Sequence, residues 1–286
     1  MKWKSFGSAV IFSILVLFVS SCKKDEVTNL SKDNVSSGRP STIDSSALVE
    51  PKTDIATTRA LVFDFLPVST TNQIVKHQYY SLSYNEEYEQ SEWVAYELKS
   101  SYVKNNNFKR PFFIKDIKVK TGSADWRNYK KSSFDKGHLC PAGDMEFDVN
   151  GYNDTFLTSN IAPQDHNFNN GVWNRLEQKV RYWAVKYDGL YVVTGAVLEP
   201  TLATIGKEKV AVPKLFYKIV FSKSEKNCKM IGFLIPNNES NAPLYQFVVS
   251  VDAIEKVTGI NFFPKLNDVL ENTLEKGSSY KNWSFE

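Results

Sequence analysis

The stretch Asp135-Lys136-Gly137-His138, continued by Leu139-Cys140-Pro141-Ala142-Gly143-Asp144, constrains the fold and the chemistry of this chain more than any other. It places one of only three histidines beside a glycine, in a run that also carries an acid and a base. An unperturbed imidazole is partly uncharged near neutral pH, so His138 can take a proton from water. Gly137 lets another backbone or a substrate phosphate come close. A lone histidine is more often structural, and a second cluster downstream reverses that preference here.

The second cluster begins with Ser159-Asn160-Ile161-Ala162-Pro163-Gln164 and continues through Asn169, Glu177 and Arg181. Glu177 and Arg181 are four residues apart, so they share one face of a predicted helix. The amide oxygen of Asn169 is a hard ligand suited to Mg²⁺, which keeps several waters, and Glu177 is placed to hold one of them. Taken alone, these residues equally suit a capping asparagine followed by a surface Glu–Arg pair. Together with His138 they favour hydrolysis of a phosphodiester.

The first 22 residues predict a lipoprotein signal peptide. Lys2 and Lys4 form a basic start, Ala9 to Val19 is an apolar run, and Ser20-Ser21-Cys22 places small residues before a cysteine. This is the layout of a secretory signal. The apolar run is shorter than a membrane-spanning helix requires, so a signal is favoured over a transmembrane helix. The run ending at Cys22 also resembles the bacterial lipobox, which predicts lipidation of Cys22 and a location in the bacterial cell envelope, exported and anchored to the membrane. An ordinary signal peptide or an uncleaved anchor is the alternative.

Residues 23–58 contain no aromatic residue and are rich in Ser, Thr, Asp and Lys. Such a composition buries too little apolar surface to offset the cost of ordering, so it predicts a flexible tether. Aromatic residues resume at Phe63, and no repeat or later linker follows. We therefore expect one folded domain over residues 59–286.

Hydrophobic patterns predict an α+β domain around a mostly antiparallel sheet. Two partly alternating runs, joined by a polar connection at 85–92, predict a strand pair at Tyr79–Tyr84 and Trp93–Leu98. Three later apolar runs predict buried strands at Leu190–Val197, Leu215–Phe221 and Met230–Ile235. Gly195 and Gly232 interrupt two of these runs and are expected to mark bulges. An apolar residue every four positions predicts a helix from about Asn170 to Tyr187. A second helix is expected between a capping Ser250 and Gly259.

The charge of the chain does not by itself predict a polyanionic partner. Without the signal peptide, 33 Lys and Arg face 32 Asp and Glu. The segment from Lys104 to Lys136 is different, because it holds ten Lys or Arg against three Asp. Such a segment suits either steering of a phosphate backbone or a solvated face.

Cys140 lies near His138, but no separate pattern marks it as a nucleophile, so it is expected to be a small packed residue.

These motifs resemble the DNA/RNA non-specific endonucleases, a family that includes the Serratia-type nuclease and mitochondrial endonuclease G. It belongs to the ββα-metal, or His-Me finger, nucleases. The family signature reads D-R-G-H, then S-N-x-x-P-Q, then N-x-x-x-W-x-x-x-E. The chain carries Asp135-Lys136-Gly137-His138, then Ser159 to Gln164, and then Asn169 with Trp173 and Glu177. The resemblance extends from about residue 63 to the end, and the order and spacing of the motifs make it specific.

The resemblance implies a role for each matching residue. His138 would be the general base, Asn169 the direct protein ligand of Mg²⁺ (or Mn²⁺), and Glu177 would orient metal-bound water. Arg181 would contact the phosphate, and Arg110 matches a further active-site arginine less securely. Lys136 replaces the usual arginine and would still bind substrate, with its charge retained but its bidentate geometry lost.

The function implied is Mg²⁺-dependent, sugar-non-specific endonuclease activity on DNA or RNA, and the family resemblance leaves a homodimer open. Two alternatives belong to other classes. One is a non-catalytic surface lipoprotein that binds nucleic acid, which the basic segment and the tether would suit. The other is a hydrolase of a different phosphodiester, such as a nucleotide or a lipid head group.

Overall fold

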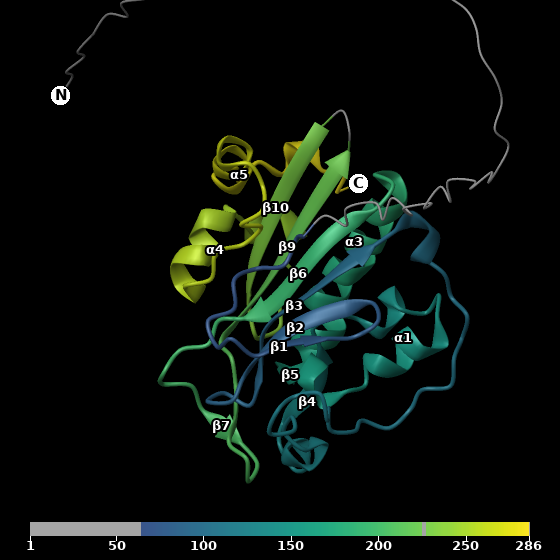
Figure 1. Ribbon diagram of the computed structural model, residues 1–286, viewed down its shortest axis with the longest axis vertical. Coiled ribbons are helices and arrows are strands. Elements are labelled where there is room, and N and C mark those ends of the chain that lie inside the picture. Colours follow the sequence, from purple (N-terminus) through teal and green to yellow (C-terminus); the bar gives the residue numbers. More distant parts are fainter. Residues whose placement is uncertain (1–63, 225–226, 286) are drawn as a thin grey trace, which may run out of the picture. The chain divides into compact units, whose positions relative to one another are not determined.

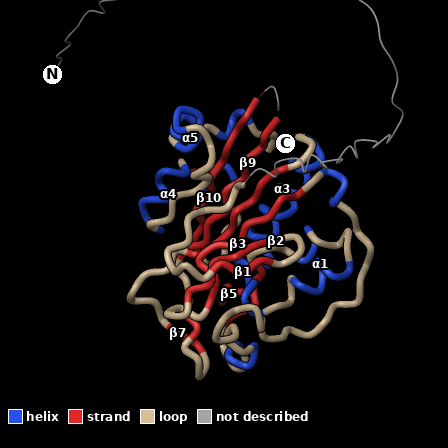
Figure 2. The backbone as a smooth tube through the Cα atoms, in the orientation of Figure 1, coloured by secondary structure: helices blue, strands red, loops and turns tan. Residues whose placement is uncertain are grey.

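A seven-stranded antiparallel sheet forms the centre of the part of the chain that the structure describes (Figures 1 and 2). The structure is a computed structural model that describes residues 64–224 and 227–285. Across the sheet the strands lie in the order β1 (Ile74–Lys76), β2 (Tyr80–Asn85), β3 (Gln90–Leu98), β6 (Leu190–Ala196), β9 (Leu215–Ser224), β10 (Asn227–Pro236) and β11 (Val248–Val249). Each neighbouring pair is antiparallel. The predicted fold class is therefore confirmed, and the five predicted strands correspond to β2, β3, β6, β9 and β10.

The central strands are apolar because both faces of the sheet are covered. Along β3, Val94 and Tyr96 belong to one buried cluster, whereas Trp93 and Ala95 belong to another. Side chains of a strand point alternately to opposite faces, so the two clusters are the cores on the two sides of the sheet.

The prediction of bulges at Gly195 and Gly232 was wrong. Both glycines lie in uninterrupted antiparallel register, and the shift in register falls between Ser83 and Tyr84 in the pairing of β2 with β3. A Cβ atom at Gly195 would lie 2.2 Å from the backbone oxygen of Glu92. Glycine is required there for close approach of neighbouring groups rather than for an extra residue in the strand.

Helix α3 (Asn174–Lys186) covers one face, and helices α4 (Val251–Thr258) and α5 (Asp268–Glu275) cover the other. The predicted caps of α4 are confirmed, because the Ser250 side chain accepts a hydrogen bond from the backbone N–H of Ala253 and Gly259 has a φ of 71°.

The predicted helix over Asn170–Tyr187 is regular only from Asn174. It is preceded by the short helix α2 (His166–Phe168) and by a π-helical turn, η5 (Asn169–Trp173). Gly171 in this turn has φ −97° and ψ −106°, which are not helical values. A regular 3.6-residue period therefore does not describe how Asn169 lies relative to Glu177.

A second pair of strands carries the Asp135–His138 motif. Strand β4 (Phe134–His138) pairs antiparallel with β5 (Ile161–Asp165), and the chain leaves β5 directly into α2, η5 and α3. This ββα order matches the architecture that the family resemblance implied. The remaining elements are α1 (Val149–Asp154), the strand pair β7 (Thr204–Ile205) and β8 (Val210–Ala211), and short 3₁₀ turns at Ser100–Tyr102, Trp126–Tyr129, Ala142–Asp144, Thr158–Asn160, Leu244–Phe247 and Tyr280–Asn282.

The predicted signal peptide, the lipidated Cys22 and the tether lie outside the described residues, and they stay predictions. Within 64–224 and 227–285, no helix has both the length and the apolar character that crossing a membrane requires.

Candidate active site

His138 ends β4, and its ring packs against two aromatic side chains that also contact each other, with their centroids 5.2 Å apart. The ring centroids are 5.1 Å apart for Phe156 and 5.5 Å apart for Phe113. Its Nε2 atom is buried and has no hydrogen-bond partner among the described residues. Burial, with a smaller contribution from the positive charge of Arg110, lowers the pKa of His138 to about 3. His138 is therefore uncharged at neutral pH, which is the state in which an imidazole accepts a proton.

Arg110 and Lys136 both lie over Phe113, and Arg110 also lies over Phe156. The guanidinium carbon of Arg110 is 5.4 Å from the Phe156 centroid and 5.8 Å from the Phe113 centroid. The ammonium of Lys136 is 5.6 Å from the Phe113 centroid. Lys136 and His138 are two residues apart on a strand, so their side chains leave the same face. The structure thus gathers two cations and an uncharged base, all three named from the sequence, around the ring of Phe113.

A cavity of about 440 Å³ opens beside these cations. Arg110 and Lys136 line it together with Pro111, Phe112, Phe113 and Trp126. Phe112 is 92% exposed, so its ring is available for contact with a ligand. Aromatic faces next to cations suit nucleotide bases next to phosphates, because bases stack on aromatic rings.

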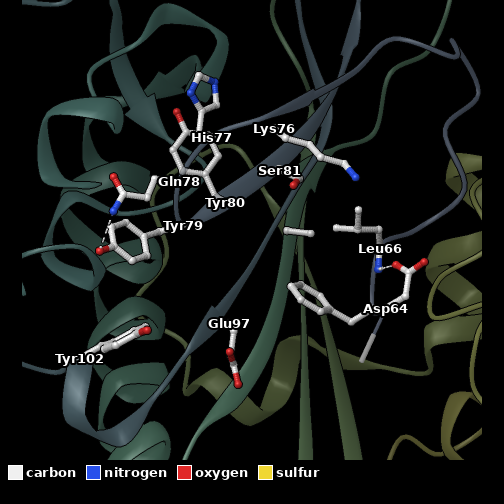
Figure 3. A pocket seen from close by; sticks show the side chains of 12 residues that line it. Asp64, Leu66, Lys76, His77, Gln78, Tyr79, Tyr80, Ser81, Glu97 and Tyr102 are labelled. Carbon is white, nitrogen blue, oxygen red and sulfur yellow. Dashed lines mark hydrogen bonds between the residues drawn. The ribbon is translucent and has the colours of Figure 1, made fainter. Parts of the chain in front are cut away.

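A second hollow of about 520 Å³ lies near β1 and β2 and contains none of the predicted site residues (Figure 3). At its edge, the His77 Nε2 atom is 2.9 Å from Asp116 Oδ2, and both side chains are buried. The hydroxyl of Ser159 donates to the same carboxylate oxygen at 2.6 Å. These contacts give His77 a structural role, because its ring is packed and paired away from the predicted site residues.

Asn169 is oriented by Asp135. The side-chain Nδ2 of Asn169 donates to Asp135 Oδ2 at 3.0 Å. Because the amide nitrogen is committed to Asp135, the amide oxygen is left to accept from water or to bind a cation. The Nδ1 atom of exposed His166 lies 3.0 Å from the same Asp135 oxygen, so His166 lies beside the Asp135–Asn169 contact.

Glu177 and Arg181 both lie on α3, but the ion pair that Arg181 forms is with Asp144. Arg181 Nη1 donates to Asp144 Oδ1 at 2.7 Å, and the Tyr96 hydroxyl donates to the other oxygen of this buried carboxylate at 2.7 Å. Arg181 is 22% exposed, so part of its guanidinium faces solvent. Asp144, the last residue of the motif quoted first, was not assigned a role from the sequence.

Burial raises the pKa of Glu177 to about 7. The positive charges of Lys218 and Arg181 oppose this rise, and Asp144 adds to it. A carboxyl group in this state gains from a nearby cation, because the cation stabilises its ionised form.

Lys218 is a buried cation that the sequence analysis missed. It lies on β9, its ammonium donates to Thr194 Oγ1 at 2.6 Å, and it sits 4.8 Å from the Trp173 ring centroid. A single lysine within the apolar run Leu215–Phe221 is the signal that would have found it, since lysine is almost never fully buried without a partner.

Cys140 is also buried, and burial raises the pKa of its thiol, which agrees with a packed residue rather than a nucleophile.

Two side-chain hydrogen bonds hold the segment 135–144 against the segment 169–181. Asp135 meets Asn169 at one end, and Asp144 meets Arg181 at the other. His138 and Glu177 lie in sequence between these two contacts. Gly137 has a packing role as well, because a Cβ atom there would lie 2.1 Å from the Gln164 side chain of the paired strand. The protein group closest to Gly137 is therefore the Gln164 side chain.

The donor set suits a hard divalent cation. Asn169 offers an amide oxygen and Glu177 a carboxylate, and Mg²⁺ binds few protein oxygens while keeping several waters. No hydrogen bond or ion pair within the described residues occupies the Glu177 carboxylate. Both observations fit the predicted division into one direct ligand and one holder of water.

Comparison with known proteins agrees with this geometry. Residues 63–269 match the family described as DNA/RNA non-specific endonuclease. The chain is 30% identical to nuclease C1 of Cunninghamella echinulata var. echinulata over 227 residues, which cover 72% of this chain and 88% of that protein. It is 33% identical to the mitochondrial nuclease EXOG of Danio rerio over 202 residues, which cover 65% of this chain and 59% of that protein. The chain therefore spans less than two thirds of the length of that second relative.

A solved structure shares the fold. One chain of the EndoG/EndoGI complex superposes with a TM-score of 0.64 at 30% identity, over 68% of this chain and 87% of that chain.

Proposed function

Because this chain belongs to the DNA/RNA non-specific endonuclease family, we propose that it hydrolyses phosphodiester bonds of DNA or RNA with a divalent cation bound at Asn169. The observation that carries the proposal is the environment of His138. It is an uncharged imidazole with two cations beside it, on a segment tied at both ends to the segment that holds Asn169 and Glu177.

In this reaction His138 takes the proton of the attacking water. Its low pKa makes it a weak base in the free protein. A phosphate bound at Arg110 and Lys136 brings negative charge to the ring, which raises the pKa of His138 and strengthens the base. Substrate binding would therefore raise the basicity of His138 beside the phosphate that is to be attacked.

Asn169, through its amide oxygen, and Glu177, through water, would hold the cation, for which we propose Mg²⁺ or Mn²⁺. A bound cation of this kind supplies neutralisation of the charge that develops on the phosphate and the leaving oxygen. Arg181 is held in place by Asp144, and the guanidinium donors that this pair does not use would bind a phosphate oxygen.

Lys136 is the departure from the family pattern. An ammonium is a point charge, so it binds one phosphate oxygen without the paired geometry of a guanidinium. Lys136 is also held near Phe113, and this keeps its charge at the site. We therefore propose that the substitution alters rate or substrate preference, and that the reaction class is retained.

Cleavage of supercoiled plasmid and of RNA by the full-length chain tests the proposal, with Mg²⁺ or with chelator. His138→Ala is expected to lower the rate by roughly 10² to 10⁴-fold, the range typical of general base catalysis. Thermal unfolding of the same variant controls for loss of the fold. Cleavage by His138→Ala at the wild-type rate would remove the assigned base.

The same experiment separates the other function classes. Binding of polymer without cleavage in Mg²⁺ would indicate a nucleic-acid-binding protein. Hydrolysis of a small diester without cleavage of either polymer would indicate a different phosphodiesterase.

A further inference from the structure

A group of three carboxylates lies on the opposite side of the sheet from α3. Asp252 and Glu255 belong to α4, and Glu275 ends α5, which Figure 1 shows beside α4. One oxygen from each lies within 4.8 Å of one oxygen from each of the others. Two oxygens on opposite sides of a Ca²⁺ ion are about 5 Å apart, because each lies about 2.5 Å from the ion. The three oxygens can therefore reach one ion.

Glu275 is the member of this group that requires explanation. It is only 5% exposed, and its Oε1 atom is buried with no hydrogen-bond partner in the described part of the chain. A buried, unpartnered carboxylate oxygen is costly, so native proteins almost always pair it or bind it to a metal.

The charges around Glu275 make the cost larger. Burial raises the pKa of Glu275 to about 8, and Glu255, Glu271 and Asp252 each add to the rise. Glu275 also stands in the last turn of α5, where no basic residue offsets the negative end of the helix. No ion pair among the described residues includes Asp252, Glu255 or Glu275.

We propose that Asp252, Glu255 and Glu275 form a binding site for a divalent cation of the Ca²⁺ class, which joins α4 to α5. Carboxylate oxygens are the ligands that Ca²⁺ prefers, and its variable coordination number lets water complete the set. Glu255 is already oriented, because one of its oxygens accepts a hydrogen bond from the backbone N–H of Phe262 at 2.9 Å. The ion stabilises this face of the sheet and takes no part in the chemistry at His138.

Calcium-dependent thermal unfolding of the full-length chain tests this site. Asn169→Ala is the background, so that a cation at the nuclease site does not contribute. Saturating Ca²⁺ is expected to raise the melting temperature by roughly 5 °C relative to chelator, as binding to the folded state alone requires. Adding Glu275→Gln is expected to abolish the rise, or to weaken Ca²⁺ binding at least tenfold by calorimetry.

Two comparisons make the result specific. Glu271→Gln is the matched control on the same helix, and it is expected to keep the Ca²⁺-dependent rise. In chelator at pH 7, Glu275→Gln is expected to melt no lower than its background, because the raised pKa leaves the Glu275 carboxyl mostly protonated and the amide is a neutral group of the same shape. A purely structural role for the carboxylate would instead lower the melting temperature in chelator.

The proposal is overturned if Ca²⁺ gives no rise in the background protein, or an equal rise with Glu275→Gln. If Glu275→Gln does not fold, Asp252→Asn provides the same test of the Ca²⁺-dependent rise. The Asp252 side chain is only partly buried, so this substitution is expected to leave the fold intact. A parallel titration with Mg²⁺ distinguishes the two hard cations, and a stronger rise with Mg²⁺ would overturn the assignment to the Ca²⁺ class.

Discussion

At the scale of single residues, the environment of each site residue matters as much as its identity. His138 was named from a motif, yet the motif gives no indication that the imidazole is packed against Phe113 and Phe156. This packing, with Arg110 nearby, keeps the ring uncharged. Glu177 shows the opposite shift for the same reason, since burial disfavours the charged form of either group.

The shifted pKa of His138 predicts how stability depends on pH. The pKa is about 3 in the folded protein and about 6.5 when the chain is unfolded. Below pH 6.5 the unfolded state binds a proton that the folded state does not, so this residue destabilises the fold as pH falls towards 3. Between pH 7.5 and 5.5, wild type should lose about 1 kcal/mol more unfolding free energy than His138→Gln, as measured by urea unfolding. Equal losses in the two proteins would show that the ring titrates normally.

At the scale of elements, the break before α3 determines how Asn169, the proposed metal ligand, is presented. The apolar period correctly predicted the helix, but Gly171 interrupts it, and Asn169 lies on the other side of the break. Asp135 on β4 then fixes the amide of Asn169. A ligand at the end of an irregular turn depends on such a contact, because the turn itself leaves its direction open.

Asp135→Ala is therefore expected to weaken cation binding while leaving the fold intact. Loss of an outer contact of this kind typically costs about 10 to 100-fold in metal affinity. The measurement is the Mg²⁺ concentration that gives half-maximal plasmid cleavage, with excess Mg²⁺ restoring much of the rate. Asp188→Ala, at an exposed turn after α3, is the matched control, and the same Mg²⁺ requirement in both variants would contradict the role of Asp135.

At the scale of the whole molecule, residues 283–285 complete the core beneath α3. Trp283 is 4% exposed, and its ring lies 4.7 Å from that of Trp183 on α3. The Trp183 indole donates to the backbone oxygen of Ser284 at 2.7 Å. This segment lies beyond residue 269, where the family match ends, yet it supports the helix that carries Glu177 and Arg181.

Trp283→Ala is expected to destabilise the protein by roughly 3 to 5 kcal/mol, because it leaves a large cavity against Trp183. Urea unfolding measures the change. Tyr280→Ala, which removes a partly exposed ring from the same segment, should cost much less. A loss below about 1 kcal/mol for Trp283→Ala would show that the segment contributes little to the core.

The sequence alone was sufficient for features that depend on local periodicity and on spaced motifs. Alternation and apolar runs located five strands of the sheet, helix caps located α4, and the motifs from Asp135 to Glu177 supplied the residues of the candidate site. These signals are readable because they repeat along the chain or follow from the chemistry of one residue type. The prediction of bulges failed because the space around Gly195 is set by Glu92 and Tyr217, which are distant in sequence.

Only the tertiary structure decided which groups meet. It placed Asp144 and Lys218 around Glu177, gathered Arg110 and Lys136 beside His138, and brought Glu275 to the acids of α4. Burial and charge at each of these places arise from packing between segments far apart in the chain, and no local pattern encodes them. The residue types of the proposed site can therefore be recognised in the sequence, whereas their protonation states and their partners are properties of the fold.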